Sequence, residues 1–472
     1  MGEDLLELVK KEVTIGTSPE KVKELMLHKG FLETDIQDAL SKAEAETAEY
    51  RETKHLVKVF SWKEMFDRVG YGFVPQQFIN ILFFLTGAGF FWLGIINGAR
   101  SVISTVLSSM FQEYSKKRQL RKRIISCSGY LYGFSFFGMA AATLLKSVPL
   151  FAASLLIGSI GVVSHGDLYQ SLKKRQLKRE KMNRFLASIA KYGVLITAVC
   201  LLVSGWLMDK FPVLGTETIM FMGKSFPLLG YLISFEVTAI AFILSGHMLA
   251  HVKDVVDQKK VDRFFRNYIK DMRIYLGTFM RNGSLFLLIL TTIIIGLVQV
   301  LGNSYYGVFI YQGFKDMAFK GFMNVAVLYF IAVMVSLLGP WFSRSVNKKI
   351  GLAPTLVFGT LLVAMTPMAM AFNPNFYAIG AALALSVLGA AIIGVSQGML
   401  VGKLLRVDER RVYFSTASMA AILPFIILLP IGSWYAQMHG LVPLFKILAG
   451  VLVIIVAPLY IVLVGMSSKR RL

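Results

Sequence analysis

The sequence predicts an all-α membrane protein with about twelve transmembrane helices in two six-helix halves and a small helical N-terminal segment. The chain has 472 residues, of which 55% are hydrophobic and 17% charged, and soluble domains are rarely so apolar. From Pro75 onward, apolar runs recur with the length of about 17–25 residues that crosses about 30 Å of hydrocarbon. The basic residues are concentrated in the loops between these runs.

Each run is expected to be a helix, because an open sheet edge would leave backbone polar groups unpaired in lipid. The second run is short and rich in serine. The predicted spans are 75–97, 100–115, 124–145, 148–166, 186–207, 227–250, 278–302, 318–342, 352–372, 376–402, 413–437 and 443–466.

The distribution of positive charge predicts the topology. Alternate loops carry thirty lysines and arginines, whereas the opposite ends of the spans carry seven, and Arg100 is counted among those seven. The positive-inside rule therefore places both termini in the cytoplasm of a multi-pass plasma-membrane protein. The predicted organisation is an N-terminal cytoplasmic segment, a first bundle, a cytoplasmic linker and a second bundle, at residues 1–72, 73–250, 251–276 and 277–472.

The N-terminal segment is predicted to be soluble and helical. Residues 1–70 carry fifteen acids and eleven bases, and Ser18-Pro19-Glu20 is a favourable helix start. A turn at Gly30-Phe31 separates two amphipathic stretches. Over about twenty residues this pattern resembles the first two helices of ubiquitin-associated-type three-helix modules, and a simple helical hairpin is the alternative. We expect this segment to be the part of the chain that would contact a protein partner.

A thirteen-residue motif, GPWFSRSVNKKIG, lies between two apolar runs at residues 339–351. A weaker copy, SMFQEYSKKRQ, starts at Ser109 and carries Glu113 at its acidic position. Glycine at the first position, arginine at the sixth and bases near the end resemble the cytoplasmic loop motif of the major facilitator superfamily. The later copy departs from that motif, because Ser343 replaces the usual acid and Val346 replaces a glycine.

The two motif copies and the two six-span halves together resemble this superfamily over about 400 residues. The resemblance implies a secondary transporter whose halves rock about a central site, and no subfamily is indicated. In that family the motif acid lies near the start of span eleven. The resemblance therefore implies a cytoplasmic gate, with candidates Glu113, Arg118, Gly339, Arg344, Lys348, Lys349, Arg410 and Arg411.

Three titratable residues are candidates for proton coupling. Glu236 is the only acid well inside a predicted span, where a charge is costly and is therefore a functional suspect. His165 and Asp167 lie at the predicted inner end of span four. The alternatives are a protonated Glu236 bonded to a neighbouring helix and a gating role for His165.

In the family, spans one, four, seven and ten line the central cavity. The resemblance therefore implies that uncharged polar residues of these spans face the substrate, and interhelical hydrogen bonding or close helix packing is the alternative. Because the predicted cavity holds almost no fixed charge, we expect a small neutral or amphipathic solute. The substrate-facing candidates are Gln77, Asn80, Ser154, Thr292, Gln299, Asn303, Ser386 and Gln397.

Other functional classes have little support in the sequence. His247 and His251 have helical metal-ligand spacing, but interfacial histidines are the simpler interpretation, and we expect no metal and no cofactor. No paired-acid, histidine-box or nucleophile pattern suggests an enzyme. A non-transporting sensor or scaffold that uses the N-terminal segment is the main alternative. The expected partners are the lipid bilayer and a small-molecule substrate, with no nucleic acid, for a monomeric protein.

Overall fold

A computed structural model describes most of the chain. The described residues are 2–15, 17, 19–117, 122–177, 179–211, 218–221, 224–227, 229–252, 277, 283–405, 410, 413, 417 and 420–469. The chain divides into two compact units, Met1–Trp62 and Lys63–Leu472. Most of the predicted linker 251–276, together with Arg118 and Arg411, lies outside the described residues.

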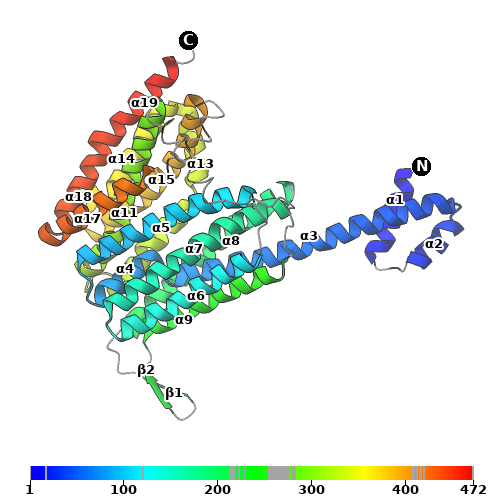
Figure 1. Ribbon diagram of the computed structural model, residues 1–472, viewed down its shortest axis with the longest axis horizontal. Coiled ribbons are helices and arrows are strands. Elements are labelled where there is room, and N and C mark those ends of the chain that lie inside the picture. The colour runs from blue at the N-terminus through cyan, green and yellow to red at the C-terminus, as the bar shows by residue number, and fades with distance from the viewer. Residues whose placement is uncertain are drawn as a thin grey trace. The chain divides into compact units, whose positions relative to one another are not determined.

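The first unit contains three helices rather than a hairpin (Figure 1). They are α1 (Gly2–Ile15), α2 (Pro19–His28) and the beginning of α3 (Glu33–Phe73). Their apolar faces share a small core whose members include Val9, Met26 and Ile36, all fully buried. The charged residues lie on the other faces, as expected for a soluble amphipathic bundle.

The second unit is built almost entirely from long helices (Figure 1). Its first half contains the end of α3 and α4 (Gln76–Leu85), α5 (Phe90–Lys117), α6 (Lys122–Leu144), α7 (Val148–Gln176), α8 (Arg179–Lys210) and α9 (Gly230–Ala250). Its second half contains α11 (Gly283–Gly313), α12 (Gly321–Ser336), α13 (Gly339–Ile350), α14 (Leu352–Phe372), α15 (Phe376–Leu404), α17 (Ile422–His439), α18 (Leu441–Gly450), the π-helical turn η1 (Val451–Val456) and α19 (Ala457–Lys469).

A short β-hairpin interrupts the helical pattern between α8 and α9. Strands β1 (Thr218–Phe221) and β2 (Lys224–Pro227) pair antiparallel, with Thr218 opposite Pro227. The sequence analysis predicted no strand at this position. The hairpin belongs to a connection between two spans and leaves the all-helical membrane region unchanged.

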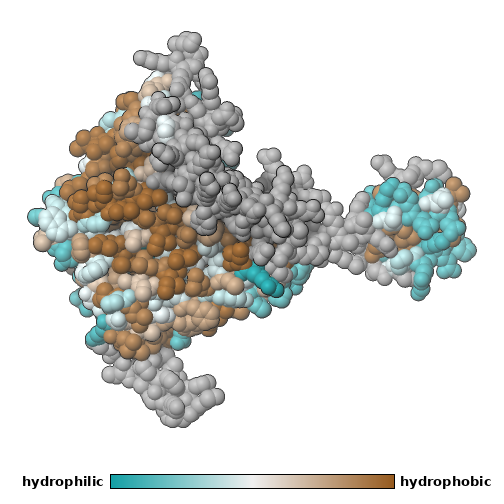
Figure 2. Space-filling model, viewed as in Figure 1, coloured by the Kyte–Doolittle hydropathy of each residue, from teal (hydrophilic) through white to brown (hydrophobic). Residues whose placement is uncertain are grey.

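Ten described helices are long and apolar enough to cross a membrane, and the bent pair α12–α13 brings the number to eleven. Hydrophobic residues cover much of the described surface on the face shown in Figure 2. Many large apolar side chains of the helices are exposed, among them Leu423 and Ile454, which are 66% and 74% exposed. Such exposure is costly in water and favourable in lipid. The chain is therefore a multi-pass membrane protein.

The predicted limits of the first two spans are wrong. Pro75 lies between α3 and α4, because its ring has no N–H to donate and interrupts the helix. Helix α4 ends at Leu85, and Gly87 turns the chain with a φ of 105°. Helix α5 then begins at Phe90 instead of residue 100. Consequently the end of α3, with its charged residues, is part of the second unit.

Candidate functional site

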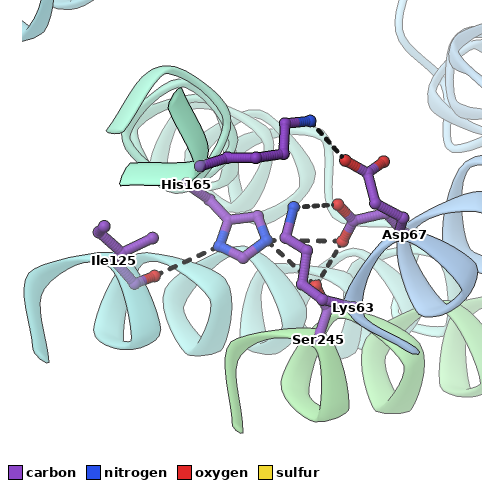
Figure 3. Close-up of polar contacts among 7 residues, drawn as sticks. Lys63, Asp67, Ile125, His165 and Ser245 are labelled. Atoms are coloured by element: carbon purple, nitrogen blue, oxygen red, sulfur yellow. Dashed lines mark hydrogen bonds and ion pairs between the residues drawn. The ribbon is translucent and has the colours of Figure 1, made fainter. Parts of the chain in front are cut away.

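Four side chains from three helices meet inside the first half of the second unit (Figure 3). Asp67 of α3 accepts hydrogen bonds from Lys63, one turn earlier, and from the Ser245 hydroxyl of α9. Nε2 of His165, on α7, lies 3.1 Å from Ser245 Oγ and 3.5 Å from Asp67 Oδ1. We call Lys63, Asp67, His165 and Ser245 the charged cluster.

The charged cluster is shielded from solvent. Lys63 is 2% exposed, Asp67 7% and His165 1%. The second ring nitrogen of His165, Nδ1, lies 3.3 Å from the carbonyl oxygen of Ile125 on α6. Buried charges are expensive unless they are paired, so the cluster must hold a defined protonation pattern. Its carboxyl and imidazole groups are able to exchange a proton with each other or with an entering water.

A second ion pair adjoins the charged cluster. Lys173 of α7 is 2% exposed and donates to Glu64 at 3.0 Å. The Tyr169 ring lies between the two lysines, 3.6 Å from Lys63 Nζ and 4.8 Å from Lys173 Nζ. Cation–π contact with this ring helps to hold both ammonium groups away from lipid.

His165 is the one sequence candidate for coupling that lies in the cluster. Asp167 is half-buried, and its backbone oxygen accepts a hydrogen bond from the Ser171 hydroxyl. Glu236 is exposed on α9 and is not among the cluster residues. Lys63 and Asp67 were not among the sequence candidates, because residues 1–72 were assigned to the N-terminal segment, whereas the second unit begins at Lys63.

Two of the substrate-facing candidates meet in the second half. Gln397 of α15 donates through Nε2 to Thr292 Oγ1 of α11 at 2.7 Å. The same nitrogen lies 3.2 Å from the Tyr413 hydroxyl, and the Thr292 and Tyr413 hydroxyls are 3.1 Å apart. This neutral polar cluster satisfies its own hydrogen bonds, which fits the interhelical alternative at least as well as a solute site.

Three further candidates, Asn80, Asn303 and Gln77, lie where the halves meet. Asn80 is fully buried, donates to the Asn303 carbonyl oxygen at 3.0 Å and accepts from Asn97 at 3.0 Å. The Asn303 side chain is exposed. Gln77 lies against Gly307, where an added Cβ would be 3.0 Å from Gln77 Cβ. These residues join α4 to α11 across the two halves.

The other candidates have different surroundings. Ser154 of α7 lies against Gly138 of α6, where an added Cβ would be 2.4 Å from Ser154 Oγ. These two small residues therefore let α6 and α7 pack closely. Ser386 donates to the Val363 carbonyl of α14 at 3.4 Å. Gln299 is exposed on α11. None of these three residues touches the charged cluster.

The later motif copy is helical rather than a loop. Residues 339–350 form α13, bent by 54° from α12. Gly339 lies against α15, where an added Cβ would be 2.7 Å from Ala391 Cβ, and Ser343 is fully buried. The basic residues of the motif, namely Arg344, Lys348 and Lys349, are exposed.

The predicted inner gate is only partly described. Glu113 belongs to α5, but its side chain lies outside the described part of the structure. Arg410 donates to the carbonyl oxygens of Gly402 at 2.6 Å and Leu405 at 3.0 Å. Arg410 therefore satisfies carbonyl groups at the end of α15, within its own half.

A direct link between the halves occurs at the predicted outer end. The Asp209 carboxylate, near the end of α8, accepts from the backbone N–H groups of Phe322 at 2.7 Å and Met323 at 2.6 Å. These are the second and third residues of α12, and the residue before that helix, Lys320, has no capping side-chain bond. Asp209 thus caps a helix of the opposite half.

Arg100 was predicted to lie at a membrane surface, and the structure places it in mid-span. It follows the start of α5 by ten residues, or about 15 Å at 1.5 Å per residue. That is about half of the hydrocarbon thickness. One terminal nitrogen of its guanidinium is buried and has no hydrogen-bond partner. Arg100 therefore places a fixed charge within a candidate span.

No family model and no curated protein matches the sequence. Solved structures do match its fold. A mutant form of the nucleoside transporter NupG has a TM-score of 0.67 at 11% identity, over 86% of this chain and 99% of that one. A structure from work on substrate recognition in proton dependent oligopeptide transporters has a TM-score of 0.65 at 12% sequence identity, over 89% of this chain and 100% of that one. A D-xylose-proton symporter has a TM-score of 0.61 at 12% sequence identity, over 86% of this chain and 97% of that one.

Proposed function

We propose that this chain, which has the fold of the major facilitator superfamily, is a secondary transporter that moves a small solute by alternating access and couples transport to protons. The observation that carries the proposal is the buried contact of Asp67 with His165, 3.5 Å apart between α3 and α7. Titratable groups inside a membrane protein are expensive to maintain and typically serve proton relay. The similar folds belong to transporters of nucleosides, peptides and sugars.

The expected neutral or amphipathic solute depended on an uncharged membrane interior. Lys63, Asp67 and one guanidinium nitrogen of Arg100 are buried inside the second unit, so its interior does carry fixed charge. The charged cluster, rather than the exposed Glu236, is therefore the better candidate for coupling. Protonation of Asp67 or His165 would alter the electrostatic contacts among α3, α7 and α9, and thereby bias one conformation over the other.

The test is transport by purified protein in proteoliposomes, with a panel of radiolabelled solutes, with and without an imposed proton gradient. Asp67→Asn should abolish gradient-driven accumulation while solute exchange survives. Glu236→Gln is the competing variant, and Asp316→Asn, at an exposed position between α11 and α12, is the matched surface control. Loss of accumulation with Glu236→Gln and not with Asp67→Asn would move the coupling site to Glu236.

A further inference from the structure

Arg100 is a half-buried cation in the middle of a candidate spanning helix, and one terminal nitrogen of its guanidinium is buried with no hydrogen-bond partner among the described residues. Other buried charges in this half are balanced. Lys63 is paired with Asp67, and Lys173 is paired with Glu64. Desolvating an unpaired guanidinium is strongly unfavourable, so a sequence selected for stability alone would not keep one here.

The surroundings of Arg100 suit an anion. The Tyr71 and Tyr132 side chains are close enough to interact electrostatically with Arg100, and their ring centroids are 6.5 Å apart. Tyr132 is 5% exposed, whereas Tyr71 is 40% exposed. Phenolic hydroxyls are hydrogen-bond donors to carboxylate and phosphate oxygens, and a guanidinium binds either group through two parallel bonds.

The position along α5 fits a solute site. On the predicted outer side, α5 packs tightly against the opposite half. An added Cβ at Gly94 would lie 1.8 Å from Ser433 Oγ, and one at Gly98 would lie 3.1 Å from a methyl group of Leu429. Arg100 follows Gly98 by two residues, at the inner edge of this packed interface. From Arg100 to Leu107 every α5 residue is half-buried. Transporters of this architecture bind their solute near the midplane, beneath the closed gate.

From these observations we propose that Arg100, with Tyr71 and Tyr132, binds the anionic group of the transported solute. The substrate class is then a small organic anion that carries a carboxylate or a phosphate. This inference rests on the proposed transport function, and it replaces the neutral solute expected from the sequence. A lipid headgroup offers the same phosphate chemistry and is therefore a separate arm of the test.

The experiment measures thermal unfolding of the full chain in neutral detergent with matched probes: benzoate and benzamide, glycerol phosphate and glycerol, and the anionic lipid phosphatidylglycerol. A charged probe should stabilise the wild type, and its uncharged counterpart should not. Arg100→Gln should weaken that binding tenfold or more, and Arg100→Lys should keep part of it. Arg123→Gln, at an exposed arginine near the start of α6, is the matched control and should bind as the wild type does.

Thermal stability without a probe distinguishes an anion-binding Arg100 from a purely structural one. If Arg100 binds an anion, Arg100→Gln should unfold at the same or a higher temperature than Arg123→Gln, because a guanidinium without a partner is removed. If Arg100 is purely structural, Arg100→Gln should unfold at a lower temperature. A lower unfolding temperature, binding that ignores Arg100, or stabilisation by phosphatidylglycerol alone overturns the anion site. Counterflow of the same probes in proteoliposomes separates the two proposals. If the probes bind in an Arg100-dependent way but are not transported, only the transport function is contradicted. If Arg100→Gln transports the uncharged probes at the wild-type rate, only the anionic substrate class is contradicted.

Discussion

Replacing Asp209 by alanine should open the outer side of the transporter. The Asp209 carboxylate provides two charge-assisted bonds to the start of α12, and no side chain of α12's own N-cap residue substitutes for them. Loss of an N-capping side chain typically costs about 0.5–2 kcal/mol. If the cap exists only when the outer ends are together, the whole of that cost falls on the outward-closed state. A free-energy change of about 1.4 kcal/mol changes an equilibrium constant tenfold, so the ratio of outward-closed to outward-open molecules should fall by roughly two- to thirtyfold.

Spin-label distances measure this ratio directly. Leu145→Cys and Tyr377→Cys place labels at exposed predicted outer positions of the two halves, after Cys127 and Cys200 are replaced by serine. Asp209→Ala should add a longer distance to the distribution. Asn375→Ala removes a comparable cap, the bond to Tyr377 N at the start of α15, but within one half. If the Asp209 and Asn375 variants give the same distribution as the parent, the cap is not part of the outer gate.

Three other outcomes are expected. A cysteine at Asn375 should react with an impermeant reagent added outside cells and one at Asn347 should not, and the reverse result would contradict the predicted orientation. Glu113→Gln should shift the population toward the inward-open state, measured by label distances across the predicted cytoplasmic face. A hydrogen bond and the positive charge of Lys23 hold the pKa of the exposed Glu33 below its usual value. This pair should therefore stabilise the first unit above about pH 4.3 and lose its effect as the pH falls further, and Lys23→Gln should remove that acid-dependent step from the melting curve.

The fold was largely predictable because lipid imposes simple rules on the sequence. Run length, the need to satisfy backbone groups and the inside bias of basic residues predict multiple spanning helices in two halves. The Gly339 motif was expected to be a loop, and its helical form, with Gly339 packed against Ala391, was not predicted. His165 was proposed from its place at the inner end of a predicted span, and it lies beside Asp67 in the structure. The Asp209 cap was not predictable, because its nearer partner, Phe322, lies 113 residues away in the sequence.

The charged cluster was missed because its charges neutralise each other locally. Lys63 and Asp67 are four residues apart, a spacing that usually marks a solvated helix face. The sequence did hold one contrary signal, Gly70 and Gly72 inside the same helix, where glycine normally destabilises by about 0.5–1 kcal/mol. Added Cβ atoms there would lie 2.6 Å from the Phe242 ring and from Cys200 Cβ. Glycines that admit neighbouring helices so closely indicate a helix packed inside the bundle rather than one with a solvated face.

Arg100 and the charged cluster share two neighbours, and this predicts how pH affects binding. Tyr71 and Tyr132 lie within electrostatic range of both Asp67 and Arg100, and Arg68 also acts on Tyr71. A negative group bound at Arg100 therefore favours an added proton at Asp67 or His165. Linkage makes this effect reciprocal, so protonation must strengthen anion binding by the same factor.

Benzoate should accordingly bind the wild type more tightly at pH 5.5 than at pH 7.5, in both thermal unfolding and equilibrium titration. The pH dependence should disappear in the double variant Asp67→Asn/His165→Gln, which removes both titratable groups and leaves Arg100 intact. Equal affinity at both pH values in the wild type, with Arg100 still required for binding, would show that the two sites do not communicate.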